Sequence, residues 1–361
     1  MTDVIIRIPK HGLRPRWVAR QSLAMLLATT ALGAVPAYAV DGTWLNAPGT
    51  NEWTTGTNWT SSPNVPNGTA TFDVSTVTGV TSNGLVTVGT IDFTSTSSTY
   101  TITTNDAFLI NGTGVTNNNI GATQTFDVAA TSNAAMVLQN SSSASFGPGP
   151  VIYNNAFIIS LTGSSTAGSA TVNNTGDLEF NNNSTAGAAT IVNAATLNFQ
   201  NSSSAGSAQI TNDATGTIAF NLTSTASTST ITNSGTGAIV DFNNTSTAAA
   251  AIITNSGTGA NVNFKDTSNA GTATITNSAT VNFNTSASAG SAVITNNNLA
   301  TITFSNSSSA GNASITNNTG GTINFNDTST AGAANINSSG ILNFNASAMA
   351  GSAFIVNNNN A

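Results

Sequence analysis

Side chains able to act as acid, base, nucleophile or metal ligand are scarce in this chain of 361 residues. Charged residues make up 5% of it, whereas ordinary globular domains contain about 25%. Cysteine is absent, which excludes disulfides, thiolate nucleophiles and thiolate metal sites. The one histidine is His11, and arginine does not occur after Arg20. Carboxylates are therefore the remaining candidates for acid–base chemistry in most of the chain.

Two carboxylates, Asp177 and Glu179, stand two residues apart, and glycosidases hold two such groups about 5 to 10 Å from each other. Leu178 and Phe180 alternate with them and should point inward, so we interpret the two acids as part of a solvated outer face. Asp241 falls at the same repeat position as Glu179, but about 14 Å away. The sequence therefore predicts no catalytic residue, no metal site and no cofactor. A polysaccharide-active enzyme is the alternative.

The first 39 residues differ from everything that follows. Five basic residues precede an apolar run over residues 22–35, and Pro36 is followed by the small-x-small pattern Ala37-Tyr38-Ala39. The apolar run is shorter than the ~20 residues that a membrane-spanning helix needs. These features predict a secretory signal peptide over residues 1–39, cleaved between Ala39 and Val40, and no transmembrane helix in the mature chain. We therefore expect export to the cell surface, the outer membrane or the extracellular space.

Cleavage would leave a strongly acidic chain. Lys265 would be the one basic side chain beside twelve carboxylates, which gives a net charge of −11. Nucleic-acid binding requires lysine and arginine to neutralise phosphates, so this composition argues against a nucleic-acid partner. Anionic lipid surfaces are disfavoured for the same reason.

The second half of the chain repeats one pattern ten times, with a period of 19 to 22 residues. The first copy contains "STAGSATVNN" at residues 165–174, and later copies have an Ala-Gly step followed four residues later by isoleucine. Seven residues before the second member of that step stands a phenylalanine in nine copies: Phe180, Phe199, Phe220, Phe242, Phe264, Phe283, Phe304, Phe325 and Phe344. Two residues after the aliphatic residue stands an asparagine in nine copies: Asn174, Asn193, Asn212, Asn233, Asn255, Asn277, Asn296, Asn317 and Asn357.

A repeat of about 20 residues is typical of a solenoid with one coil per repeat. Within each copy apolar residues alternate with polar ones, as in Leu178-x-Phe180, which indicates strands rather than helices. We predict an all-β, right-handed parallel β-helix of about ten regular coils, preceded by irregular coils and an N-terminal cap. The boundaries are residues 1–39 for the signal peptide, 40–160 for the cap and irregular coils, and 161–361 for the regular coils.

Stacking of identical positions explains the polar residues of the repeat. We expect the phenylalanines to form one core ladder and the asparagines another, in which side-chain amides bond from coil to coil. We also expect each asparagine to take the left-handed conformation at a sharp corner. A column of like charges would repel along its whole length, which accounts for the scarcity of charge.

Residues 40–160 follow the repeat less regularly. Trp44, Trp53 and Trp59 lie close together, and we interpret them as the cap over the open end of the solenoid. A sugar-binding aromatic platform is the alternative. Ile152 lies 20 residues before Val172, so we expect it to occupy the same column.

The order of these features resembles autotransporter passengers of Gram-negative bacteria, and in particular those built from autotransporter-associated β-strand repeats. The resemblance is carried by the regular coils, by "LINGTGVTNN" at residues 109–118, and by Trp44, Trp53, Asn58-Trp59, Pro63, Pro66 and Ala70-x-Phe72. It implies export through the inner membrane and presentation or release at the cell surface. It also implies a C-terminal outer-membrane β-barrel, and here the sequence departs from the family pattern, because it stops at "NNNA" in mid-coil. We expect either a barrel downstream or a different route across the outer membrane.

Together these features predict a secreted or cell-surface passenger that acts as a scaffold or adhesin without catalysis. Its expected partners are host or environmental surface glycans or proteins. A glycan-binding or ice-binding solenoid is a further alternative, because one outward column, a single residue wide, repeats threonine: Thr211, Thr232, Thr254, Thr276, Thr295 and Thr316.

The leader gives a direct prediction. Material exported by a Gram-negative host should begin at Val40, because Ala37-Tyr38-Ala39 follows the apolar run. N-terminal sequencing of the exported protein measures this. Recovery of exported protein that still begins at Met1 would contradict the assignment.

Overall fold

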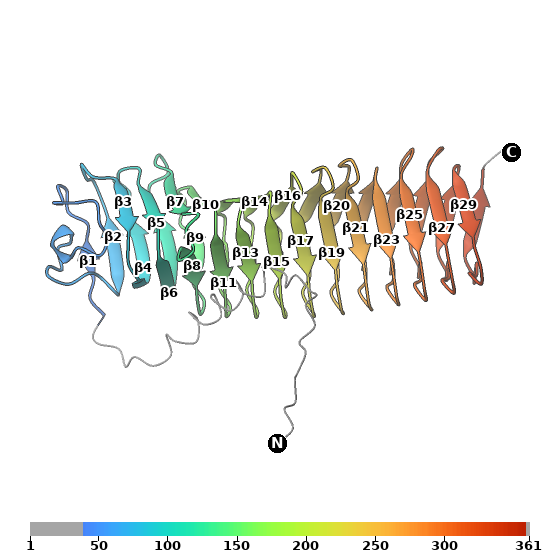
Figure 1. Cartoon of the computed structure of the whole chain (residues 1–361), viewed down its shortest axis with the longest axis horizontal. Coiled ribbons are helices and arrows are strands. Elements are labelled where there is room, and N and C mark those ends of the chain that lie inside the picture. Colours follow the sequence, from blue (N-terminus) through green and yellow to red (C-terminus); the bar gives the residue numbers. More distant parts are fainter. Residues whose placement is uncertain (1–38, 359–361) are drawn as a thin grey trace, which may run out of the picture. The chain divides into compact units, whose positions relative to one another are not determined.

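The computed structural model describes residues 39–358, which form a stack of β-coils along one axis (Figure 1). Successive coils add parallel strands to two sheets, one of 16 strands and one of 14. We call these the Phe sheet and the Asn sheet, after the columns they carry. Within the described residues the one helical element is η2, a 3-10 turn over Gly56–Asn58. The predicted class, an all-β solenoid of parallel strands, is confirmed.

The Phe sheet consists, in spatial order, of β1 (Gly42–Thr43), β2 (Thr69–Phe72), β4 (Val86–Phe93), β6 (Ala107–Asn117), β8 (Ala135–Leu138), β11 (Ile158–Leu161), β13 (Asp177–Phe180), β15 (Thr196–Phe199), β17 (Thr217–Phe220), β19 (Ile239–Phe242), β21 (Asn261–Phe264), β23 (Thr280–Phe283), β25 (Thr301–Phe304), β27 (Thr322–Phe325) and β29 (Ile341–Phe344), with β9 (Ser143–Phe146) paired to β6.

The Asn sheet consists of β3 (Gly79–Ser82), β5 (Thr101–Thr104), β7 (Gln124–Val128), β10 (Val151–Asn155), β12 (Thr171–Asn174), β14 (Thr190–Asn193), β16 (Gln209–Asn212), β18 (Thr230–Asn233), β20 (Ile252–Asn255), β22 (Thr274–Asn277), β24 (Val293–Asn296), β26 (Ser314–Asn317), β28 (Asn335–Ser338) and β30 (Phe354–Asn357).

The phenylalanines of the regular coils lie in one continuous stack inside the solenoid. From Phe180 to Phe344, neighbouring ring centroids are 4.7 to 4.9 Å apart and neighbouring ring planes differ by only 4 to 8°. Strands of ordinary sheets rotate by about 20 to 25° from one to the next. Each coil therefore sits almost directly on the one before it, and the regular stack is nearly untwisted.

A third, minimal column of parallel bridges closes each coil, and the sequence pattern did not predict it. Its members are Ser143, Thr166, Thr185, Ser204, Thr225, Thr247, Asn269, Ser288, Ser309, Thr330 and Met349. The Thr166 and Thr185 hydroxyl oxygens each accept the backbone N–H two residues later, at 3.0 Å. In eight of the ten repeats a serine or threonine stands two positions before the second member of the Ala-Gly step. This was the available signal, because such residues favour tight turns.

The corners of the coils are not formed by the asparagine column, so that part of the prediction is wrong. Left-handed backbone occurs instead two residues after the phenylalanine, as at Asn182 (φ 58°), and at the Ala-Gly step, as at Gly187 (φ 62°). A Cβ at Gly187 would lie 2.8 Å from the carbonyl oxygen of Gly168 in the coil below. The asparagines end the strands with their side chains inward, and extended strands need no left-handed residue.

The irregular coils continue the same two sheets, so residues 40–358 share one core. The register at β10 differs from the prediction by one residue, because Tyr153 rather than Ile152 pairs with Val172. Tyr153 is 1% exposed, stacks on Phe126 at 5.0 Å, and donates its hydroxyl hydrogen to the Ala144 carbonyl at 2.6 Å. The aromatic ring gains more from burial than isoleucine would, and a one-residue shift turns Ile152 outward.

The stacked phenylalanines predict a large difference between neighbouring residues of β25. Phe304→Ala should lower the free energy of unfolding by about 3 to 5 kcal/mol, because the ring lies 4.7 Å from both Phe283 and Phe325. Thr303→Ala, on the outward side of the same strand, should change it by less than about 0.5 kcal/mol. Urea titration of both variants measures the difference. Equal destabilisation would show that the inner and outer faces are misassigned.

Candidate functional site

The candidate acids Asp177 and Glu179 lie on the outer side of β13, and Leu178 and Phe180 fill the core beneath them. Glu179 is in register with Asn198, Ala219 and then Asp241, which is three strand steps away. At about 4.8 Å per step, Asp241 is about 14 Å distant, beyond the range that glycosidases use. Asp241 and Glu179 therefore do not form a catalytic pair.

Asp177 and Glu179 are largely buried, at 9% and 6% exposure, so the expectation of a solvated face is wrong for this pair. Burial raises the pKa of Glu179, and the Asp177 carboxylate raises it further, although the Asn181 amide favours the charged form. A carboxyl that holds its proton more tightly is suited to general acid catalysis. A polysaccharide would nevertheless have only 9% and 6% of these residues to contact.

Other carboxylates terminate ladders of asparagine amides on the outside of the fold. In one ladder the Asn173 amide donates to Asn154 at 2.8 Å, and the Asn154 amide donates to Asp127 at 2.7 Å. In another, Asn282 donates to Asn263 at 2.9 Å and Asn263 donates to Asp241 at 2.8 Å.

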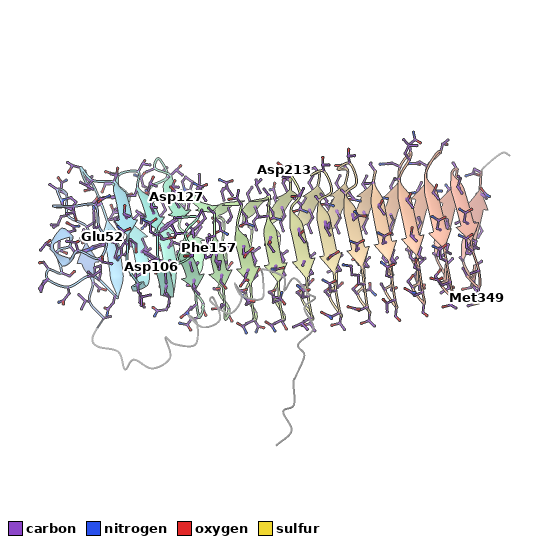
Figure 2. The ribbon with its side chains drawn as sticks, viewed as in Figure 1. Glu52, Asp106, Asp127, Phe157, Asp213 and Met349 are labelled. Atoms are coloured by element: carbon purple, nitrogen blue, oxygen red, sulfur yellow. The ribbon has the colours of Figure 1, made fainter. Side chains whose placement is uncertain are left out.

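The same arrangement recurs near the first coils, where Asn105 donates to Asn83 at 2.9 Å and Asn83 donates to Glu52 at 2.5 Å. Figure 2 shows Glu52 at the blue end of the stack and Asp127 several coils further along. Each acid lies at the end of its ladder nearer the N-terminus, where the last amide needs an acceptor. These carboxylates are bound into the fold rather than presented to a substrate.

Lys265 is also bound into the fold. Its ammonium group lies 2.7 Å from Asp241 Oδ2, and this is the one ion pair among the described residues. Its side chain is 38% exposed, so the pair is screened by solvent and contributes little to stability. Within residues 39–358, no three His, Cys, Asp or Glu side chains gather as metal ligands would.

The interior asparagines form a hydrogen-bonded ladder of uniform direction. The Asn174 amide donates to Asn193 Oδ1 at 2.7 Å, and the same bond recurs from coil to coil at 2.7 to 2.9 Å as far as Asn317. Its last member donates to the Ser338 hydroxyl at 3.0 Å. The second hydrogen of the Asn174 amide goes to the Thr196 carbonyl at 2.8 Å, which links the Asn sheet to the Phe sheet of the next coil. The asparagines thus hold the coils together and are not presented as a binding site.

The three tryptophans close the first coils and are buried to 1%, 0% and 1% exposure. The Trp44 indole N–H donates to the Val77 carbonyl at 3.0 Å, and that of Trp59 donates to the Trp53 carbonyl at 2.8 Å. Ring centroids of Trp59 and Phe72 are 5.4 Å apart at a steep angle, a favourable edge contact. Because the ring faces are covered, the alternative of a sugar-binding platform is wrong.

The leader lies largely outside the described residues, which begin at Ala39, so Ala37 has no structural account. Val40 is part of the fold: its N–H donates to Asn67 Oδ1 at 2.7 Å, and its carbonyl accepts the N–H groups of Asn67 and Gly68 at 3.0 Å. Among residues 39–358 no helix is long and apolar enough to cross a membrane.

No protein-family model, curated protein or solved structure matches the chain. What the chain does must therefore be inferred from the chemistry of its own residues.

The interior ladder predicts a large cost for removing one amide. Asn255→Ala should lower the free energy of unfolding by about 2 to 4 kcal/mol, because the Asn233 amide loses its acceptor and Asn277 Oδ1 loses its donor. The exposed Asn312, for which no side-chain bond is seen, provides the control: Asn312→Ala should cost less than about 0.5 kcal/mol. Urea titration compares the two.

A charged variant tests the same site by its pH dependence. Asn255→Asp would bury a carboxyl and raise its pKa in the folded state above the unfolded value of about 3.9. The unfolded state would then release its proton first, so stability should fall as pH rises from about 4 towards 7. A stability of Asn255→Asp that does not change over this interval would show that residue 255 is not buried.

Proposed function

We propose that this chain is a non-catalytic, exported β-solenoid passenger that acts as a scaffold or adhesin at the cell surface. The observation that carries the proposal is the repetition of uncharged side chains in register on the outside of the stack. On the Asn sheet the residue before each ladder asparagine is threonine in six successive strands, from Thr211 to Thr316. Such a surface offers the same weak contact many times over, which suits adhesion by avidity.

Export is supported by the contacts of Val40. The residue that follows the predicted cleavage point, Val40, makes backbone hydrogen bonds through both its N–H and its carbonyl. Cleavage between Ala39 and Val40 would keep both, because a free α-amino group can still donate to Asn67 Oδ1. The fold thus requires nothing upstream of Val40 for these bonds. The resemblance to autotransporter passengers agrees with this route.

The composition favours uncharged partners. Without the leader the chain carries a net charge of −11, which disfavours polyanions such as nucleic acid. The partners we propose are surface glycans or proteins of a host or of the environment, bound through repeated polar contacts.

Deleting one coil in register tests the adhesive role. Phe283 and Phe304 occupy the same column, so removal of residues 284–304 leaves both ladders continuous. Adsorption of the full chain and of this variant to cellulose films and mucin films is measured with a quartz-crystal microbalance. The shorter variant should dissociate severalfold faster, because it makes fewer simultaneous contacts.

The thermal stability of the shortened variant serves as its control, since a solenoid loses only nearest-neighbour contacts when one coil is removed. Failure of the full chain to adsorb to either film would contradict the adhesive role. Release of reducing sugars from a polysaccharide by the full chain would show instead that the protein is an enzyme.

A further inference from the structure

The outer side of the Asn sheet between β16 and β26 presents two columns of uncharged side chains, which we call the threonine face. The first column is threonine throughout: Thr211, Thr232, Thr254, Thr276, Thr295 and Thr316. The second column stands two residues earlier in each strand. It carries threonine in β18 and β22, the β-branched Ile252 and Val293 in β20 and β24, Gln209 in β16 and Ser314 in β26.

The threonine hydroxyls of this face make no hydrogen bond to any described residue. Thr232 and Thr276 are partly exposed, and Thr230 and Thr274 beside them are exposed. Other hydroxyls of the same coils behave differently: Thr225 and Thr247 cap backbone N–H groups, and Thr245 donates to the Leu222 carbonyl. The threonine face therefore offers free hydroxyls and methyl groups to whatever lies against it.

The face is flat and regular in two directions. Along the stack, the phenylalanine rings on the Phe sheet of the same coils repeat every 4.7 to 4.8 Å with a rotation of only 4 to 6°, so successive coils are nearly untwisted. Across it, residues two apart in a strand lie about 6.6 Å apart. Six strands in unbroken register give a length of about 24 Å. The two columns hold no charged residue, although the described part of the chain is strongly acidic.

We propose that the threonine face binds an ordered water lattice, which in practice is the surface of ice. Each threonine places a methyl group, which restricts neighbouring water, next to a hydroxyl that can bond to it. Held in register, the six threonines of the first column fix first-shell waters at regular intervals along the stack, and Thr230 and Thr274 extend this order to the second column. A crystalline water surface presents the same kind of regular, uncharged hydrogen-bonding array.

The chemistry of the face favours this ligand over a sugar polymer or a second copy of the chain. Sugar sites combine an apolar wall with a few convergent polar groups, whereas this face is flat and its strands contain no aromatic residue. Face-to-face packing of two copies would bury the free hydroxyls against one another and remove their water. The experiment below also tests for binding of a sugar polymer and of a second copy.

The experiment measures thermal hysteresis and the fraction of protein that enters a slowly growing ice front, using tryptophan absorbance and the full chain. The unaltered chain should show hysteresis and enrichment in ice. Thr276→Lys combined with Thr295→Lys should reduce both to the level of buffer with albumin, because two hydrated ammonium groups would stand on the flat face. Thr303→Lys is the matched control, since it alters the same residue type at the same strand position on the Phe sheet, and it should keep full activity.

A milder variant separates loss of ice binding from loss of folding. Thr276→Ser combined with Thr295→Ser keeps both hydroxyls and removes two methyl groups, and it should lower the hysteresis while thermal unfolding stays unchanged. Absence of hysteresis and of ice enrichment in the unaltered chain would overturn the proposal, as would an equal loss in Thr303→Lys. Adsorption to crystalline cellulose that the paired lysine variant abolishes, without ice enrichment, would assign the face to a polysaccharide. Dimerisation that the same variant abolishes would assign it to a second copy.

Discussion

In-register stacking of each residue on its own counterpart is the constraint from which the rest of this structure follows. A side chain is acceptable only if a copy of it can stand about 4.8 Å above and below. Phenylalanine meets this condition by parallel ring stacking, and asparagine meets it because its amide both donates and accepts. Lysine and the carboxylates do not, since like charges would repel in every coil. The low charge content of the chain is thus a consequence of its architecture.

The amide ladders have directions, and these directions decide where the few acids stand. In the interior, each asparagine donates to the following coil, as Asn255 does to Asn277. On the outside, amide-to-amide bonds run the other way, as from Asn282 to Asn263. An outer ladder therefore ends towards the N-terminus on an amide that needs an acceptor. Asp127 and Asp241 supply acceptor oxygens and have no hydrogen to donate when ionised, so they fit only at that end.

Much of the fold could be predicted from spacing, because the alternation Leu178-x-Phe180 and the fixed distance from phenylalanine to the Ala-Gly step define strands and a coil. The third column was not predicted, because it contributes one residue per coil and so has no apolar alternation that would mark a strand. The register at Tyr153 depended on which of two adjacent large side chains gains more from burial. The low exposure of Asp177 and Glu179 could not be predicted either. Strand alternation indicates which residues point outward, but not what covers them. For the threonine face, the sequence showed the column but not the lack of twist that makes it flat.

The interior also shows how strongly the coil spacing limits what polar residues can do. A column of buried serines, among them Ser246, Ser268 and Ser308, has hydroxyls without a hydrogen-bond partner among the described residues. At about 4.8 Å apart, these hydroxyls are too distant to bond to one another, whereas the longer asparagine side chain spans the same gap. Ala287 shows that the column does not need the hydroxyl. The inner columns are thus restricted to a few residue types, and variation that changes binding must fall on outward positions, where the threonine face lies.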